Sequence, residues 1–265
     1  MVWRGVEEML NVANLALVRI TSPERVRPAA EAFRDIVSEF GAFRIAPCHN
    51  IAVKHPMADA DGNILATEVF GWTSEQSDRW WKSPRIALDS PLPTACRYES
   101  DPFWCNAQGI HTLVPNSFLD AIDLSNFEQR ALTKAAIVVP VHLPFGQVGA
   151  VSLTSADPAK EDLSEEFAVF GEEFGIYART FVASYVRVMC RAERLPAGSR
   201  LSKREVECLR WAAIGKTDQE ISMIMSRSRA TVRFHIHNAS LKLDAVNRSQ
   251  TVFKAAQLGY IGLNS

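Results

Sequence analysis

Cysteine is scarce in this sequence, and the few that occur form no pattern. Five are spread over 265 residues, and no two stand as Cys-x-x-Cys. An odd number of widely spaced cysteines argues against a disulfide framework and against a zinc site. We therefore expect reduced, mostly buried thiols and no bound metal. The five are Cys48, Cys96, Cys105, Cys190 and Cys208.

Long apolar runs are also missing. The longest, Ala135 to Val141, is far shorter than the roughly 20 residues that cross a bilayer. Glu7 and Glu8 stand where a secretory signal would have basic residues followed by an unbroken apolar run. We therefore expect no membrane partner and a cytoplasmic location.

The short motifs that mark common catalytic sites are absent as well. The sequence has no glycine-rich phosphate loop, no His-x-x-x-His pair and no nucleophile elbow. Its remaining candidates, His49, His55, His111 and His142, are scattered along the chain. We expect no catalytic residues and no enzyme activity, and an enzyme with a regulatory tail stays as an alternative that detectable turnover would revive.

Charge is divided unevenly along the chain. Residues 199–265 hold eleven Lys/Arg and five Asp/Glu, a balance of +6, whereas residues 1–198 hold eighteen and twenty-five, a balance of −7. A basic segment of this kind is typical of a nucleic-acid-binding module, although a solvated basic surface has the same charge. Proline, glycine and serine occur together at Leu195–Ser199, which predicts a linker. We expect a first domain at 1–195, a linker at 196–200 and a second domain at 201–265.

Hydrophobic residues make up 47 % of the chain, enough for a core in each domain. In the first domain, apolar residues at helical spacing predict helices, and β-branched or aromatic runs predict strands. The expected helices are Glu7–Arg19, Pro23–Phe40 after a Ser22 cap, Asp78–Lys82, Phe118–Lys134 and Glu161–Leu195. The expected strands are Phe43–Val53, Ile64–Phe70 and a buried hairpin of Ala136–His142 and Gln147–Thr154.

These elements predict an α+β chain. Its first domain is an α/β/α sandwich with a mainly antiparallel sheet, an arrangement of many small-molecule sensors. In the long helix, the aromatic stripe from Leu163 to Phe181 is expected to pack on the sheet. The second half, from Tyr185 to Leu195, is a candidate dimer contact.

The second domain has strong local signals for helices. Ser202-x-x-Glu205 and Thr217-x-x-Glu220 are capping boxes, and Gly215 stands where the first of these helices should end. Expected helices therefore cover 203–214, 218–225 and, after Ser226-Arg-Ser228, 229–243. Two helices joined by a short turn, the second rich in cations, indicate a helix-turn-helix in an all-α four-helix domain.

The third helix of this domain has two faces. Val232, Ile236, Ala239 and Leu243 fall on one apolar stripe, which leaves Arg229, Arg233, His237 and Ser240 outside. Arginine can reach O6 and N7 of guanine with two hydrogen bonds, so Arg233 is our candidate base-reading residue. Thr231 and Lys242 are candidate phosphate contacts.

Residues 201–256 resemble the DNA-binding domain of LuxR-type transcription factors. The resemblance rests on Arg204-Glu205, Trp211, Gly215-Lys216-Thr217, Glu220-Ile221, Thr231-Val232, Phe234-His235, Asn238, Lys242-Leu243 and Arg248. It implies double-stranded DNA as a partner, a homodimer paired in part through a fourth helix at 248–259, and RNA polymerase as a further partner. The expected DNA-binding residues are Lys216, Thr217, Arg229, Thr231, Arg233, His237 and Lys242.

The segment from Trp72 to Trp104 resembles the acyl-homoserine-lactone-binding domain of quorum-sensing members of that family. The resemblance implies that Asp89 accepts the amide N–H of the ligand, that Trp104 walls the pocket and that Ser152 bonds the ligand carbonyl. The expected ligand-binding residues are Trp72, Gln76, Trp80, Asp89, Phe103, Trp104 and Ser152.

The pocket departs from the family pattern at three positions. Gln76 stands at the position of a tryptophan, and Trp72 and Trp80 stand at the positions of tyrosines. Because an indole donates but does not accept, the hydrogen bonds offered to a ligand are altered. The expected ligand is an acyl-homoserine lactone or a non-lactone signal, plant-derived molecules included, with no other cofactor. The expected function is a ligand-responsive dimeric regulator of a roughly palindromic promoter site, and a ligand-independent regulator is the alternative.

Overall fold

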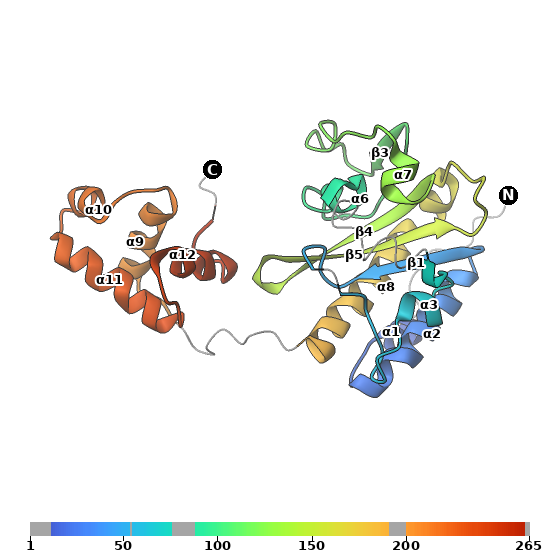
Figure 1. Ribbon diagram of the computed structural model, residues 1–265, viewed down its shortest axis with the longest axis horizontal. Helices are drawn as coiled ribbons and strands as arrows, with labels where there is room; N and C mark the ends of the chain where they lie inside the picture. Colours follow the sequence, from blue (N-terminus) through green and yellow to red (C-terminus); the bar gives the residue numbers. More distant parts are fainter. Residues whose placement is uncertain (1–11, 54, 76–87, 191–199, 263–265) are drawn as a thin grey trace. The chain divides into compact units, whose positions relative to one another are not determined.

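The computed structural model describes residues 12–53, 55–75, 88–190 and 200–262 (Figure 1). The described residues form two compact units, the first made mainly of residues within 12–190 and the second mainly of residues 200–262. The predicted linker at 196–200 lies almost entirely outside the described residues. No helix in the described ranges has the length and apolarity needed to cross a membrane.

The first unit is built on a five-stranded sheet. The strands run in the order β1-β5-β4-β2-β3, and every neighbouring pair is antiparallel, as the sequence predicted. Their bounds are β1 Phe43–Cys48, β2 Phe103–Asn106, β3 Gly109–Thr112, β4 Ala135–Leu143 and β5 Gln147–Ser155. The predicted hairpin is confirmed as β4 and β5, joined by the 3-10 turn η3 at Pro144–Gly146. β4 lies at the centre of the sheet, and only His142 in it is exposed.

Helices on one face of the sheet enclose the first of two cores (Figure 1). Phe33 of α2 lies at its centre, stacked on Phe174 at 5.8 Å and close to Phe181 at 5.4 Å, both from α8. All three side chains are almost fully buried. The elements on this face are α1 Val12–Val18, η2 Pro23–Arg25, α2 Val26–Ser38, α3 Leu65–Glu68 and α8 Ser164–Met189.

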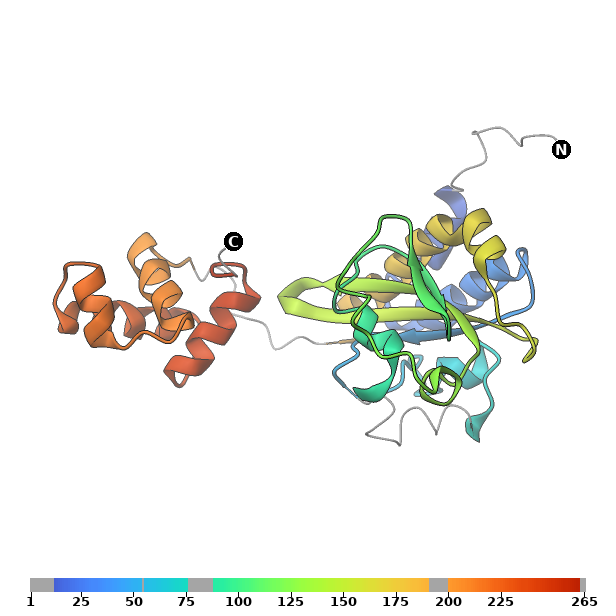
Figure 2. The same cartoon turned by 90° about the horizontal axis from the view of Figure 1, so that it is seen from above.

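The opposite face carries a thinner layer and the second core (Figure 2). Two short helices, α6 Pro91–Ala95 and α7 Phe127–Ala131, lie there with the loops around them. Their apolar residues pack on Phe103, Cys105 and Val138 from β2 and β4. Helices on both faces of an antiparallel sheet confirm the predicted sandwich.

The prediction of a strand at 64–70 was wrong. The turn at 59–63 is closed by the bridge between Ala58 and Ile64, and α3 begins directly after it. A helical turn places Leu65, Val69 and Phe70 together, and all three are buried in the first core. The buried side chains of this run therefore share one side of a helical turn, and they do not alternate between two faces as they would in a strand.

The long helix predicted at 118–134 was also wrong. Only α7 at Phe127–Ala131 is helical, because Asn126 before it and Leu132 after it both take left-handed backbone angles, φ 52° and 58°. Asp123 closes a local turn by accepting from the amide of Ser125 at 2.9 Å. Side chains of Asp and Asn that bond nearby backbone compete with helix formation in this way.

Other predicted elements were confirmed with different bounds. Pro23 begins the 3-10 turn η2 and α2 follows it, but the Ser22 side chain makes no capping bond. The predicted long helix is α8. Its second half packs on the first core up to Met189. Within it, the Tyr185 hydroxyl donates to the carbonyl of Ala58 at 3.1 Å. The predicted helix at 78–82 lies outside the described residues.

The second unit consists of four helices, as predicted. Both capping boxes form, and Gly215 takes the left-handed angle, φ +87°, after the first helix. The bounds are α9 Lys203–Ala213, α10 Asp218–Ile224, α11 Arg229–Lys242 and α12 Arg248–Gln257. The all-α helix-turn-helix architecture is therefore confirmed.

Candidate functional site

Helices α9 and α10 each begin with a capping box. Ser202 accepts from the amide of Glu205 at 3.3 Å, and Glu205 accepts from the amide of Ser202 at 2.7 Å. Thr217 and Glu220 repeat this arrangement at 3.3 and 2.7 Å. Because each box satisfies two backbone donors, both helices begin at defined residues.

Helix α11 has the two faces that its sequence predicted. Val232, Ile236 and Ala239 are buried, whereas Arg229, Arg233 and His237 are exposed. The side chain of Ser228 caps the helix by accepting from the amide of Thr231 at 3.0 Å. Three of the predicted DNA-binding side chains therefore lie on one accessible face.

Arg233 does not stand alone on that face. Its Nε lies 3.4 Å from Oδ2 of Asp218, the first residue of α10. Oδ1 of the same carboxylate accepts from Nη1 of Arg248, the first residue of α12. Arg248 also donates through Nη2 to the carbonyl of Lys216 at 2.7 Å. Three helices of the unit thus meet at one carboxylate.

The other predicted DNA contacts already have partners within the unit. The ammonium of Lys242 binds both carboxylate oxygens of Glu205, at 2.9 and 2.8 Å. Thr231 shares a 2.8 Å hydrogen bond with Ser228, and Lys216 lies 3.7 Å from Glu220. The backbone amide of Thr217, at 2.7 Å, and its hydroxyl, at 2.9 Å, both donate to the carboxylate of Glu220, and these bonds lower the pKa of Glu220.

In the first unit, the strand register brings two predicted ligand-binding residues to one face. Phe103 of β2 lies opposite Val138 of β4, and Val138 lies opposite Ser152 of β5. Phe103 is fully buried in the second core, and Ser152 is half-buried. Both therefore face the α6 and α7 side of the sheet.

The structure does not bring Trp104 to that face. It follows Phe103 in the strand, so its side chain points to the opposite side. There it packs on the first core and stacks on His111 at 4.1 Å. Trp72 lies near β1, donates from its indole nitrogen to the carbonyl of Ile45 at 2.8 Å, and has the guanidinium of Arg44 5.9 Å from its ring centre. Gln76 and Trp80 lie outside the described residues.

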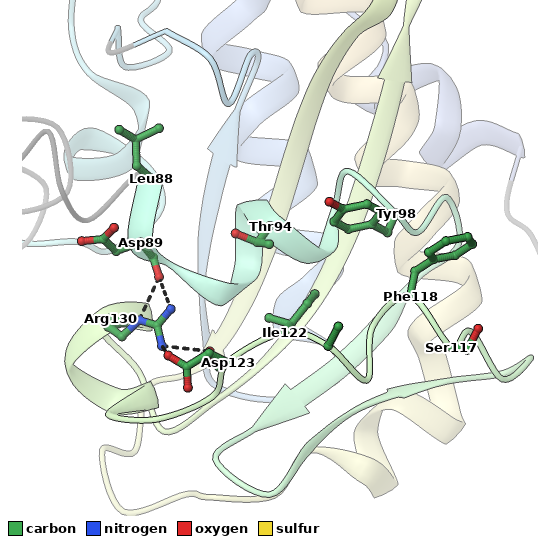
Figure 3. Close-up of a pocket in the computed structure, with 10 residues that line it drawn as sticks. Leu88, Asp89, Thr94, Tyr98, Ser117, Phe118, Ile122, Asp123 and Arg130 are labelled. Atoms are coloured by element: carbon green, nitrogen blue, oxygen red, sulfur yellow. Dashed lines mark hydrogen bonds and ion pairs between the residues drawn. The ribbon is translucent and has the colours of Figure 1, made fainter. Parts of the chain in front are cut away.

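Asp89 is exposed and lines a pocket of about 460 Å³ on the α6 and α7 side (Figure 3). The carboxyl group points away from Arg130, whereas the backbone carbonyl accepts from Nε and Nη2 of Arg130 at 2.8 and 2.5 Å. Nη1 of the same arginine donates to the carbonyl and the carboxylate of Asp123, at 2.8 and 2.9 Å. Arg130 therefore links Asp89 and Asp123, which belong to two separate segments that line the pocket.

The pocket has an apolar side and a polar side. Tyr98 and Phe118 are stacked with ring centres 6.1 Å apart, and both are more than half exposed. Asp89 and Asp123 place carboxylates on the other side (Figure 3). Sequence reasoning missed Arg130, because its partners Asp123 and Asp89 lie 7 and 41 residues away in the sequence. It also missed Tyr98 and Phe118. Within the described residues, no group of His, Cys, Asp or Glu side chains is placed to hold a metal ion.

Comparisons with known proteins agree with this geometry. Residues 199–255 match the family described as "Bacterial regulatory proteins, luxR family". The chain is 38 % identical over 141 residues to the quorum sensing-dependent transcriptional regulator RpaR of Rhodopseudomonas palustris, covering 51 % of this chain and 54 % of RpaR. It is 34 % identical over 128 residues to the transcriptional activator VanR of Vibrio anguillarum, covering 48 % and 52 %.

A match to a solved structure extends over nearly the whole chain. The crystal structure of Escherichia coli SdiA aligns with 94 % of this chain and 96 % of that one, with a TM-score of 0.51 and 22 % identity, which shows a shared fold. The sequence matches span about half the length of the two curated relatives. Residues 199–255 therefore form a domain of the LuxR family of bacterial regulatory proteins, and the chain as a whole shares the fold of SdiA.

Proposed function

We propose that this protein is a signal-responsive transcription regulator. Its first unit binds a small amphipathic molecule, and its second unit binds a promoter site. The observation that carries the proposal is the exposed face of α11, where Arg229, Arg233 and His237 stand on a capped helix of a family helix-turn-helix. The signal-responsive part is supported by the similarity to RpaR, which is a quorum sensing-dependent transcriptional regulator.

The DNA-binding mode follows from the shape and charge of the second unit. An α-helix fits the major groove, and residues 199–265 carry a charge of +6 that attracts phosphates. A homodimer places two copies of α11 on a roughly palindromic site, with half-site centres about 10 bp apart or a multiple of that. Arg233 reads a base, flanking cations and helix termini hold phosphates, and RNA polymerase is the partner at the promoter.

The ligand is an acyl-homoserine lactone or a non-lactone molecule with a similar division into polar and apolar parts. The pocket beside Asp89 supports this class, because it pairs stacked aromatic rings with carboxylates. Trp72 affects which of these two kinds of ligand can bind, because its indole N–H already donates to the carbonyl of Ile45. A ligand that needs a donor from Trp72 must therefore compete with that bond.

Selection from a random DNA pool tests the regulatory function. The purified full chain, alone and with a mixture of acyl-homoserine lactones, is incubated with random duplexes, and the bound duplexes are sequenced. We expect enrichment of a two-fold symmetric motif with guanine at the positions reached by Arg233. A chain that enriches no sequence in either condition contradicts the proposal.

Native mass spectrometry tests the ligand and the dimer together. The chain is expressed with and without acyl-homoserine lactones and plant extract, and its mass is read for two protomers and a retained small molecule. Asp89→Asn removes the carboxylate charge at an exposed site, so we expect it to lose the ligand and keep the fold. Retention of no molecule under any condition instead supports a ligand-independent regulator.

A further inference from the structure

Asp218 receives two arginines from different helices of the second unit. Nε of Arg233 on α11 lies 3.4 Å from Oδ2, and Nη1 of Arg248 on α12 donates to Oδ1. The Asp218 side chain is 19 % exposed, whereas that of Arg233 is 67 % exposed. The carboxylate is thus fixed in the unit, and the arginine that contacts it projects toward solvent.

The surroundings of Asp218 make it a rigid anchor. It directly follows Thr217, whose side chain caps α10. Arg248 is held in turn, because its Nη2 donates to the carbonyl of Lys216 at 2.7 Å. An anchor with two fixed neighbours has little rotamer freedom of its own, so it restricts the side chain that it contacts.

We propose that Asp218 is a positioning residue for base reading by Arg233. This inference rests on the proposed DNA-binding function. A free surface arginine has many rotamers, and ordering such a side chain on binding costs about 0.5–1.5 kcal/mol. A contact at Nε restrains the arm while the terminal nitrogens form the fork that matches O6 and N7 of guanine. Asp218 thereby lowers the cost of the specific complex.

Charge removal and loss of positioning predict different effects of a substitution at Asp218. Asp218→Asn removes one negative charge near the candidate DNA surface, which by itself strengthens binding to any duplex. Positioning instead predicts that the variant loses preference for the correct site. The ratio of affinities for the selected and scrambled sites therefore separates the two effects.

The experiment is a double-mutant cycle on the full chain. Affinities of wild type, Asp218→Asn, Arg233→Ala and the double variant are measured by fluorescence anisotropy on a labelled duplex with the selected motif and on a scrambled duplex. We expect Asp218→Asn to lower the affinity ratio by about three- to tenfold. In the Arg233→Ala background the same change has no further effect on the ratio, because its target is gone. Asp244→Asn, the same charge change at an exposed position after α11, is the matched control and leaves the ratio unchanged.

Each other outcome overturns the inference. Equal effects of Asp218→Asn with and without Arg233 show that the carboxylate acts through another group. Equal loss of affinity on both duplexes shows that Asp218 supports the fold alone, and unchanged affinities on both duplexes show that Arg233 is oriented without it. A wild-type chain that enriches no motif overturns the proposed function itself, and this result is distinct from all three.

Discussion

Lys242 and Glu205 join the end of α11 to the first turn of α9. The ammonium of Lys242 lies 2.9 and 2.8 Å from the two oxygens of a carboxylate that is only 4 % exposed. The same carboxylate accepts from the amide of Ser202 in the capping box. Burial raises the pKa of Glu205, but the bonds from Lys242 and Ser202 outweigh it and hold the pKa below its usual value.

The lowered pKa of Glu205 gives the second unit a dependence on pH. A carboxyl whose pKa is lowered by folding stabilises the folded state above its unfolded pKa, about 4.3, and this contribution is lost as pH falls through the folded value. We expect Glu205→Gln to cost about 1–2 kcal/mol at pH 7 and to weaken the loss of stability on acidification. Protection factors of α9 and α11 amides at pH 7 and pH 4 measure both effects. Glu207→Gln, in an exposed pair with Arg204, is the control and changes neither.

Arg233→Ala is expected to weaken binding to the selected DNA site by about 1–3 kcal/mol. Binding to scrambled DNA changes little, because the lost contact is to a base, and ligand binding stays intact. Anisotropy titrations on the two duplexes measure the difference. Arg204→Ala removes the same charge from α9 and serves as the control. Equal losses of affinity on both duplexes count against a base-reading role.

Arg130→Ala is expected to loosen both walls of the pocket beside Asp89. The substitution removes donors to three backbone carbonyls and one carboxylate, at 89, 123 and 125. We expect a loss of stability of about 2 kcal/mol and faster hydrogen exchange in residues 88–95 and 123–131. Arg34→Ala, which removes an exposed pair with the adjacent Asp35, leaves exchange in these segments unchanged. Unchanged exchange in Arg130→Ala would show that packing alone holds the pocket walls.

Phe33→Ala is expected to cost about 3–5 kcal/mol in the first unit. Phe33 is fully buried and contacts the rings of Phe70, Phe174 and Phe181. Truncation leaves a cavity between α2 and α8 that the surrounding aromatic rings cannot fill. Urea denaturation measures the change, and Val169→Ala on the same α8, 77 % exposed, is the control with an effect near zero. A loss below about 1 kcal/mol would mean that the core closes over the missing ring.

Local sequence signals explain why the second unit was predicted nearly residue by residue. The boxes at Ser202 and Thr217 and the glycine at 215 act within one helical turn, so neighbours in the sequence determine where the helices start and stop. Contacts such as that of Asp218 with Arg233 and Arg248 join separate helices, and no spacing in the sequence predicts them.

The first unit shows where local signals fail. The apolar run at 64–70 fits a strand by composition, but burial in the first core selected a helical turn. The helical spacing at 118–134 was overridden by left-handed residues at Asn126 and Leu132. Among the predicted ligand-binding residues, alternation along β2 places Phe103 and Trp104 on opposite faces of the sheet, and this consequence follows only once the strand bounds are known.

The strand order determines when the first unit can fold during synthesis. β1 pairs with β5, and Phe43 meets Ser155, more than a hundred residues later in the chain. At translation rates of about 5–20 residues per second, several seconds pass between the synthesis of β1 and α2 and the emergence of β5 and α8, on which they pack. The four helices of the second unit contact one another within about sixty residues, so they fold soon after they emerge. The interval before β5 emerges, when the apolar surface of the first unit is exposed, is therefore the stage of biosynthesis at which aggregation is favoured most.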